Sequence, residues 1–348
     1  MTTYELVRPD GTPLVDISKI AADRSWRRRR NNSDSVSFKL SVDKWEATCR
    51  KLGVHPRDLI RNNWTEVRVK EGDVYVAAGQ IQYLKTSLKA GMIDIQAPGY
   101  LDLFRRRRTA ALRTFDDIDG ADIAWTLIDE SQNLPNGQLY ITRGPNQTTS
   151  GPHDRTYKRT VLKDALQAFG NIQFDPFDIE ITPLKEFNTY LQLGSSRPDI
   201  AFIWGKNIID ADVTEDTTDL VNELDALGSG FGDDVVAEVI VENEASQADY
   251  GLCQEMITAN ATDNSDGGLD REAAAYLAAW SLPVILIDVQ VDGGKAPFVT
   301  DYGLGDYVFI DLTGHPWLDG MKGMFRVQEQ NCVISDDDQR VVTLTVSQ

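Results

Sequence analysis

The C-terminal stretch, residues 305–348, constrains the fold most strongly because it alternates apolar and polar residues with a period of two. Three such segments lie between polar turns, at residues 307–312, 325–334 and 340–346. Val308, Ile310 and Leu312 fall on one side of the first segment, as in a strand with one buried face. The aspartate-rich turn at 335–339 is costly to bury, so we expect a hairpin tip in water.

A similar series of short β-rich segments occurs near the start of the chain. Residues 66–97 contain several such segments, with polar turns at 71–73 and 89–91. Both stretches carry an apolar-Gln step on a middle strand, Ile81-Gln82 in one and Val327-Gln328 in the other. We interpret them as two degenerate copies of one small antiparallel barrel; the alternative is a chance similarity between two meanders.

The net charge of −19 is unevenly distributed along the 348 residues. Residues 1–110 carry 21 Lys and Arg against 13 Asp and Glu, a net charge of +8. Residues 111–348 carry 14 against 41, a net charge of −27. A chain with a basic third and an acidic two-thirds is suited to partners on both faces, including copies of itself arranged so that opposite signs touch.

Composition and length favour a soluble protein with several cores. No apolar run approaches the ~20 residues that span a bilayer, and residues 1–5 lack the pattern of a signal peptide, so we expect synthesis in the cytosol. The three cysteines, Cys49, Cys253 and Cys332, are widely separated and form no C-x-x-C pair. They are expected as buried apolar side chains rather than as metal ligands or a disulfide.

The predicted elements divide the chain into three parts. Residues 1–110 are predicted as a first β-barrel domain, with one short helix near 44–52. Residues 111–200 are predicted as an α+β insert domain. Residues 201–348 are predicted as a second β-barrel domain with a helix near 270–280. The fold class is therefore mainly β with an α+β insert: two related small antiparallel barrels plus a helix-containing domain.

Within residues 111–200, helices are predicted at 118–132, where i, i+4 apolar pairs follow capping-box spacing, and at 155–169. The stretch 144–154 is rich in Gly, Pro, Asn, Gln and Thr and predicts an exposed loop. Short strands are predicted at 139–142, 177–181 and 190–193. Further strands are predicted at 201–205, 235–241 and 283–291, while 220–227 fits either a helix or a strand.

Motifs for catalysis and for cofactors are missing from the sequence. His55, His153 and His315 are not in H-E-x-x-H or H-x-H spacing, and no G-x-S-x-G elbow occurs. Residues 228–232 are glycine-rich but lack the G-x-G-x-x-G pattern and a Lys-Ser/Thr end. Residues 263–268 resemble the start of a calcium loop, but the required glycine and the twelfth position do not fit. We predict a non-enzymatic protein without cofactor or metal.

Two runs of four arginines are the candidate interface residues: Arg27, Arg28, Arg29 and Arg30, and Arg105, Arg106, Arg107 and Arg108. They could bind an acidic protein surface or nucleic-acid phosphates, or they could be solvated side chains whose inner members pair with carboxylates. No stacking aromatic residues are interleaved with them, and the whole chain is acidic, which disfavours nucleic acid. An acidic protein partner or a neighbouring subunit is the favoured interpretation.

Several short segments occur in an order that spans nearly the whole chain. They are SVSFKL at 35–40, LDLFRRR at 101–107, DIAWTLIDESQ at 122–132, RTY at 155–157, YG at 250–251 and GDYV at 305–308. In this succession the chain resembles the tail hub proteins, often called minor tail proteins, of long-tailed siphovirus-like phages. The resemblance implies a virion structural protein of the baseplate-hub type at the tail tip, made in the host cytoplasm.

The resemblance also implies an assembly. Tail hubs of this kind are homotrimers whose two barrels per chain make a pseudo-sixfold ring under a sixfold tube. Contacts are implied with the distal tail protein, the tail tube, the tape-measure protein and the tip or fibre proteins. DNA would pass through the ring without specific binding. We expect acidic residues to line that channel, because a negative wall repels phosphates.

Two other functions stay open at this point. One is a cell-wall hydrolase at the tail tip, acting through an Asp/Glu pair in residues 111–200, since 54 acidic residues guarantee candidate pairs. The other is a β-rich receptor-binding module.

Overall fold

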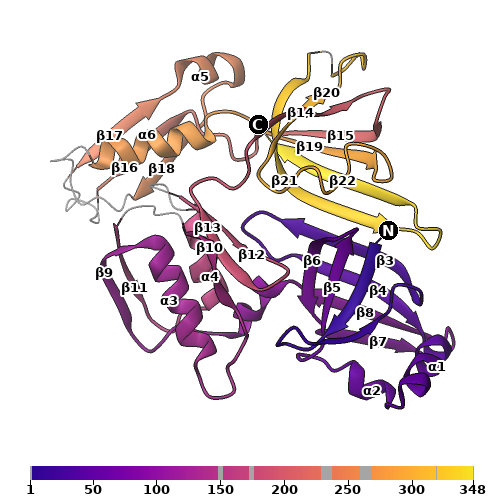
Figure 1. Ribbon diagram of the computed structural model, residues 1–348. Coiled ribbons are helices and arrows are strands. Elements are labelled where there is room, and N and C mark those ends of the chain that lie inside the picture. The colour runs from indigo at the N-terminus through magenta and orange to yellow at the C-terminus, as the bar shows by residue number, and fades with distance from the viewer. Residues whose placement is uncertain are drawn as a thin grey trace. The chain divides into compact units, whose positions relative to one another are not determined.

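β-strands dominate the computed structural model (Figure 1), which describes residues 2–147, 152–171, 176–228, 237–258, 268–318 and 320–347. The predicted fold class, mainly β with an α+β insert, is confirmed. The chain splits into two compact units. Unit 1 comprises Met1–Asn171, Phe177–Asp212 and Asp288–Gln348, and unit 2 comprises Ile172–Pro176 and Val213–Ile287. None of the described helices has the length and apolar character needed to cross a membrane.

The N-terminal part of unit 1 is built from short strands. They are β1 (Thr2–Val7), β2 (Pro13–Asp16), β3 (Ala21–Arg29), β4 (Ser35–Ser41), β5 (Glu66–Glu71), β6 (Val74–Gln80), β7 (Tyr83–Ser87) and β8 (Met92–Pro98), with helices α1 (Val42–Leu52), α2 (Pro56–Leu59) and η1 (Tyr100–Arg106). Strands β2, β1, β5 and β6 form one sheet. Tyr4 of β1 meets Phe38 of β4 edge to face at 5.9 Å, so this sheet packs on the sheet that contains β4.

The C-terminal part supplies β14 (Ser196–Ile203), β15 (Ile208–Asp216), β19 (Val284–Asp292), β20 (Tyr307–Asp311), β21 (Lys322–Ile334) and β22 (Arg340–Ser347). The predicted meander is confirmed: β20, β21 and β22 pair antiparallel in sequence order. The turn at 335–339 is exposed, as predicted. Cys49 and Cys332 are buried, Cys253 is half-buried, and all three are free thiols.

One ten-stranded sheet joins the two ends of the chain. Strand β21 pairs antiparallel with β3, where Trp26 lies opposite Cys332 and both are buried. The order is β15-β19-β22-β21-β3-β4-β8-β7, with β20 also on β21 and β14 on β20. Backbone hydrogen bonds therefore run from the N-terminal β region into the C-terminal one (Figure 1). The domain boundaries at residues 110 and 200 stay a prediction.

The described sheets are open, so the barrel closure expected from the sequence is not present in the described part of one chain. The end strands of the ten-stranded sheet, β15 and β7, each have a neighbour on one side only within that part. The two stretches compared in the sequence also differ in how their strands are distributed between sheets. Residues 66–97 divide between two sheets, whereas β20, β21 and β22 lie in one.

The insert between these parts contains β9 (Arg113–Asp119), α3 (Gly120–Gln132), β10 (Thr142–Gln147), β11 (Pro152–Tyr157), α4 (Leu162–Gln167), η2 (Ala168–Asn171), β12 (Asp178–Ile181) and β13 (Glu186–Tyr190). Its strands form a sheet of order β10-β13-β12 and the pair β11-β9. Helix α3 confirms the helix predicted at 118–132, although it begins two residues later, after Asp119, whose side chain accepts from the N–H of Ala121.

Three of the helix and strand predictions for the insert are wrong. The helix predicted at 155–169 begins as a strand, because residues 155–157 pair with β9 and this tertiary pairing overrides the helical spacing. Residues 139–141 are not a strand, because the side-chain amide of Gln132 binds both backbone groups of Ile141. The strand predicted at 190–193 is β13 instead, which ends at Tyr190. Three consecutive residues of β13, Phe187, Asn188 and Thr189, are buried, so both faces of the strand are covered and it lacks the alternation that marks a half-buried strand.

Strands also occupy most of the loop predicted at 144–154, of which residues 148–151 lie outside the described part. The strand predicted at 235–241 is β17 (Glu238–Glu242), with residues 235–236 again outside it. The strands predicted at 201–205 and 283–291 correspond to β14 and β19.

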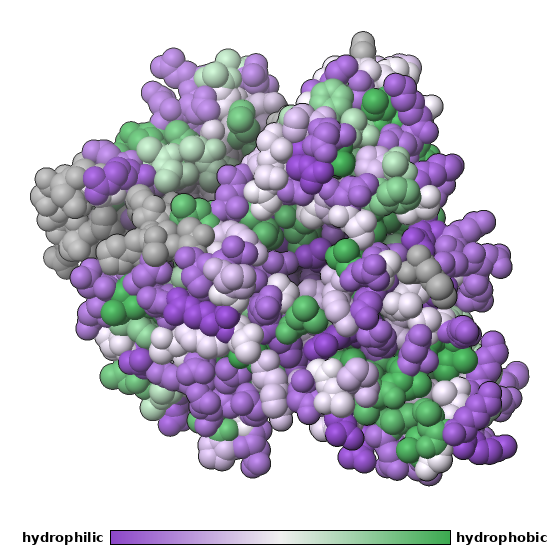
Figure 2. Space-filling view, in the orientation of Figure 1, coloured by the Kyte–Doolittle hydropathy of each residue, from purple (hydrophilic) through white to green (hydrophobic). Residues whose placement is uncertain are grey.

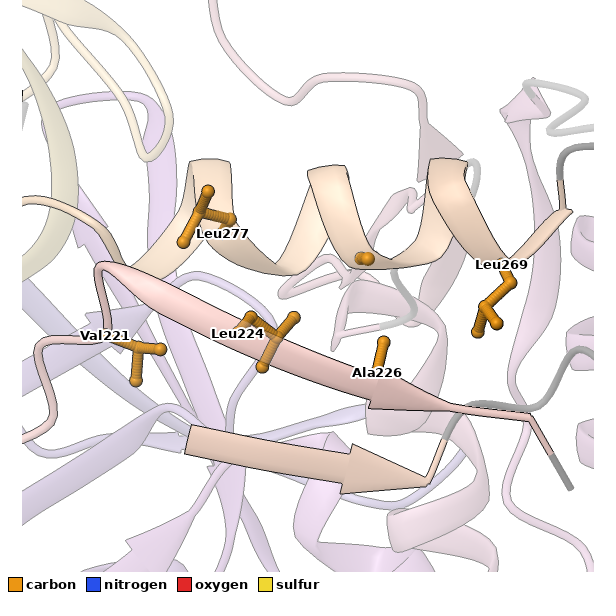
Figure 3. Packing of buried hydrophobic residues seen from close by; sticks show 6 residues of the cluster. Val221, Leu224, Ala226, Leu269 and Leu277 are labelled. Atoms are coloured by element: carbon orange, nitrogen blue, oxygen red, sulfur yellow. The ribbon is translucent and has the colours of Figure 1, made fainter. Parts of the chain in front are cut away.

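Unit 2 is a small sheet covered on one face by a helix. Strand β16 (Glu223–Leu227) lies between β17 and β18 (Gln254–Thr258), and α5 (Glu244–Tyr250) connects these two. Helix α6 (Gly268–Trp280) confirms the prediction near 270–280, and the ambiguous stretch 220–227 ends in a strand. The core between α6 and β16 (Figure 3) consists of Val221, Leu224, Ala226, Leu269, Ala273 and Leu277.

A single buried carboxylate, Asp178 on β12, ties three distant segments of unit 1 together. Its Oδ1 accepts from Arg30 Nη1 at 2.6 Å and from Asn31 Nδ2 at 2.7 Å. Its Oδ2 accepts from Arg326 Nη2 at 2.7 Å and from the N–H of Leu193 at 2.8 Å. Burial raises the pKa of Asp178, but the Leu193 N–H and the two guanidinium groups outweigh it, so the pKa lies below the ordinary 3.8.

We predict that Asp178→Asn lowers the free energy of unfolding by about 3 to 5 kcal/mol at pH 7, because it leaves two partly buried guanidinium groups without a counter-charge. Since the folded pKa is depressed, the wild-type advantage is fully present above the ordinary pKa of 3.8 and is lost as pH falls through the lower folded value. Urea unfolding of both proteins between pH 7 and pH 2 measures this.

Asp199→Asn is the matched control. It removes the same charge from an exposed pair with Arg197, in which the Asp199 side chain is 61% exposed. Its effect on the free energy of unfolding should be much smaller than that of Asp178→Asn, because an exposed ion pair contributes little to stability. Equal losses for the two variants would contradict the role given to Asp178.

Candidate partner-binding site

The first arginine run is held inside the protein's own ion-pair network. Arg27 pairs with Glu329, its Nη2 donating to Oε2 at 2.8 Å, and Arg28 pairs with Glu180 at 2.9 Å. Arg29 donates to the carbonyl of Ser33 at 2.9 Å. Arg30 belongs to the Asp178 cluster already described. These contacts fasten the end of β3 to β21 and to the insert.

The second run is placed differently. Arg105 is exposed and has only long contacts, 3.3 Å to Asp102 Oδ2 and 3.5 Å to Gln82 Oε1. Arg107 is anchored, because its guanidinium donates to two backbone carbonyls, those of Ser131 and Gly137. Arg106 and Arg108 are exposed, and their side chains have no ion-pair or hydrogen-bond partner in the described ranges. The guanidinium groups of Arg106 and Arg108 are therefore left without an acidic partner within the described residues.

Three members of the second run line a pocket in unit 1 with a volume of about 390 Å³. Arg105, Arg106 and Arg107 share its wall with Trp64, Tyr140 and several side-chain amides. The volume lies within the range of ordinary ligand sites. A pocket rich in guanidinium and amide donors with aromatic walls is suited to a carboxylate-bearing ligand.

The wall of this pocket also contains a buried ion pair. Lys185 Nζ donates to Glu66 Oε1 at 2.5 Å, and the two side chains are 3% and 0% exposed. The remaining protons of Lys185 go to the backbone carbonyls of Pro9 at 2.7 Å and Leu139 at 3.0 Å. Tyr100 donates to the other oxygen of Glu66 at 3.0 Å. The pair is thus fully hydrogen-bonded, as a buried pair must be to persist.

Burial dominates the electrostatics of this pair. It raises the pKa of Glu66, which the ammonium of Lys185 opposes. It lowers the pKa of Lys185, which Glu66 opposes in turn. Burial also raises the pKa of Tyr100, and the neighbouring Glu66 adds to the effect, so Tyr100 remains a hydrogen-bond donor at neutral pH.

Sequence reasoning did not identify Glu66, Lys185, Trp64 or Tyr140 as parts of one site. Glu66 and Lys185 lie 119 residues apart, and a lone Lys or Glu carries no local signal. The backbone of Lys185 adopts a φ of 66°, which is uncommon for a residue other than glycine and has no signal in the sequence. Only the folded chain brings them to the second arginine run.

The acidic residues of the insert do not converge on a common point. Asp122 pairs with Arg143, Glu130 with Arg113, and Glu180 with Arg28. No cluster of three or more His, Cys, Asp or Glu residues able to hold a metal occurs in the described segments. The two motif-like stretches, 228–232 and 263–268, fall almost wholly outside those segments.

Solved structures show that the chain has the fold of phage tail proteins. The tail protein from Neisseria meningitidis MC58 matches 100% of this chain and 96% of its own, at 12% identity and a TM-score of 0.68. The 43 kDa tail protein of prophage MuSo2 from Shewanella oneidensis matches 99% and 97%, at 11% identity and 0.67. Prophage tail protein gp18 from Listeria monocytogenes EGD-e matches 99% and 94%, at 11% identity and 0.63.

A more distant match comes from Escherichia coli. A component of its type VI secretion system, itself described as similar to the tail proteins gp27 and gp5 of bacteriophage T4, covers 94% of this chain with 73% of its own. The identity is 9% and the TM-score 0.53. No protein-family model and no curated relative matches the chain. The resemblance to tail hub proteins seen in the sequence is confirmed at the level of the fold.

We predict that replacing only one member of the Glu66–Lys185 pair strongly lowers the stability of the folded chain. Glu66→Gln or Lys185→Met alone should each lower the free energy of unfolding by about 3 to 5 kcal/mol, because each leaves a buried partner uncompensated. The double variant should lose clearly less than the sum of the two. Denaturant unfolding of the four proteins measures the coupling.

The exposed pair Glu46–Arg50 on α1 is the control cycle, with side chains 56% and 77% exposed. Its coupling should be about 0.3 to 0.5 kcal/mol. Additive losses at Glu66 and Lys185 would show that the buried pair does not act as a unit.

Proposed function

We propose that the chain is a structural tail hub protein of a phage virion, forming a ring at the distal end of the tail tube. The observation that carries the proposal is the extent of the structural match. The match to the Neisseria tail protein covers 100% of this chain and 96% of that protein, so the likeness extends over both β regions and the insert. Its role would be to link the tube and distal tail ring to the tip proteins.

The open sheet supports assembly with other copies. Strands β7 and β15 end the ten-stranded sheet, and an edge strand can accept a strand or a side-chain contact from another chain. In a homotrimer the two β regions of each chain, 1–110 and 201–348, would give six similar sections facing a sixfold tube. The acidic balance of residues 111–348 fits a channel wall that DNA passes without binding.

An apolar surface near β7 also supports a protein contact. Figure 2 shows an apolar area at lower right, where Figure 1 places α1 and β7. The exposed apolar side chains of these elements and of the turns beside them are Leu52, Val54, Tyr83 and Leu88. Exposed apolar groupings of this kind are typical of protein–protein contacts. The tail tube, the distal tail protein, the tape-measure protein and the tip or fibre proteins are the partners that such a hub would have.

Removal of the gene for this chain tests the proposal. Particles made without it should have tails that lack the distal tip and should be non-infective, and supply of the chain in trans should restore both. The single-site variant Asp199→Asn, supplied in trans, is a control that should restore infectivity fully because it changes only an exposed ion pair. Normal tips and full infectivity without the chain would refute the hub function.

The hydrolase alternative has no structural observation in its favour, since the paired acids of the insert are engaged with arginines. The receptor-binding alternative likewise has none in the described residues. Neither is proposed.

A further inference from the structure

The pocket lined by Arg105, Arg106 and Arg107, here called the arginine pocket, contains positive charge that its own carboxylates do not neutralise. Arg106 has no partner in the described ranges, and Arg105 makes only the two long contacts given above. Asp102, which is half-buried in the wall, already pairs with Arg105 and with Lys163, the latter at 3.1 Å. The buried Glu66 is already paired with Lys185. A ligand with one or two carboxylates would balance the pocket.

The chain carries one segment of matching chemistry, the turn between β21 and β22. Asp336, Asp337 and Asp338 are its only run of three consecutive acidic residues. Asp338 is held by Arg24 and Arg340 at 3.3 Å each. Asp336 and Asp337 are exposed, and neither has a side-chain partner within the described residues. The turn therefore presents two free carboxylates on a braced hairpin.

Strand β5 separates the pocket from this turn. Glu66, at the start of β5, lines the pocket, whereas Glu71, at its end, binds Arg340 at 3.2 Å just after the turn. Five residue steps of extended chain correspond to about 17 Å. The carboxylates of one chain consequently lie too far away to fill the pocket of the same chain, and they face the opposite end of the strand.

We propose that the Asp336-Asp337 turn of one copy inserts into the arginine pocket of a second copy. The guanidinium groups of Arg105 and Arg106 would bind the two carboxylates through charge-assisted hydrogen bonds, while the braced Asp338 keeps the turn rigid. A contact between opposite ends of β5 is head-to-tail, the kind that closes into a ring when the rotation permits. This inference rests on the proposed hub function, and it names the contact that joins the copies.

Cysteine cross-linking tests the contact directly. In a Cys253→Ser background, which removes the only native thiol that is not buried, Arg106→Cys and Asp337→Cys are combined. Mild oxidation of the purified protein and of assembled tails should give chain-to-chain disulfides only when both new cysteines are present. The pair Arg106→Cys with Glu46→Cys, on the exposed face of α1, is the control and should give none. Absence of the specific product in both samples overturns the contact.

Charge reversal gives an independent readout. Arg105→Glu with Arg106→Glu, or Asp336→Lys with Asp337→Lys, should each raise the dissociation constant between copies by at least about tenfold, measured by sedimentation at low salt. Combining both reversals in one chain should restore most of the affinity, since the opposite signs meet again. Unchanged association in both reversals overturns the contact. The hub function fails separately, if the wild-type chain is missing from purified tails.

Discussion

Asp178 is the point on which the arrangement of unit 1 depends, because its two oxygens bind groups from the end of β3, from β21 and from the turn after β13. Arg30 directly follows β3, and Arg326 lies on β21, the strand that pairs with β3. Backbone hydrogen bonds already join β3 to β21, and the Asp178 carboxylate attaches the insert to this pair of strands. A buried charge is tolerated there because four donors satisfy it.

This junction explains why two runs of identical composition have different surroundings. The first run lies on β3, at the seam between the N-terminal and C-terminal regions, where nearby acids pair with its members. The second run extends through η1 and beyond it, and within the described residues only the Arg107 side chain of this run binds the backbone of the insert. The two runs carry the same charge, but the fold uses the first for its own ion pairs and leaves Arg105, Arg106 and Arg108 of the second exposed.

Much of the fold could be predicted from local pattern. The C-terminal meander, α3 and α6 follow period-2 or helical spacing in segments whose burial is one-sided, so the sequence signal is clear. The errors fall where tertiary contacts decide. Residues 155–157 become a strand through pairing with β9, and β13 carries no alternation because both of its faces are buried. The joining of β3 to β21 spans about 300 residues and has no local signal at all. The same holds for the arginine pocket. A run of four arginines stands out in the sequence, whereas no local pattern marks Glu66 and Lys185 as parts of the same site.

The central claim is that copies of this chain form the ring that ends the tail tube. Electron microscopy of the intact particle tests it most directly, by locating the chain and counting its copies. The account predicts three copies around the tail axis at the distal end of the tube, each contributing two β regions to a ring of six similar sections. A location away from that axis, or a copy number that is not three, would contradict it.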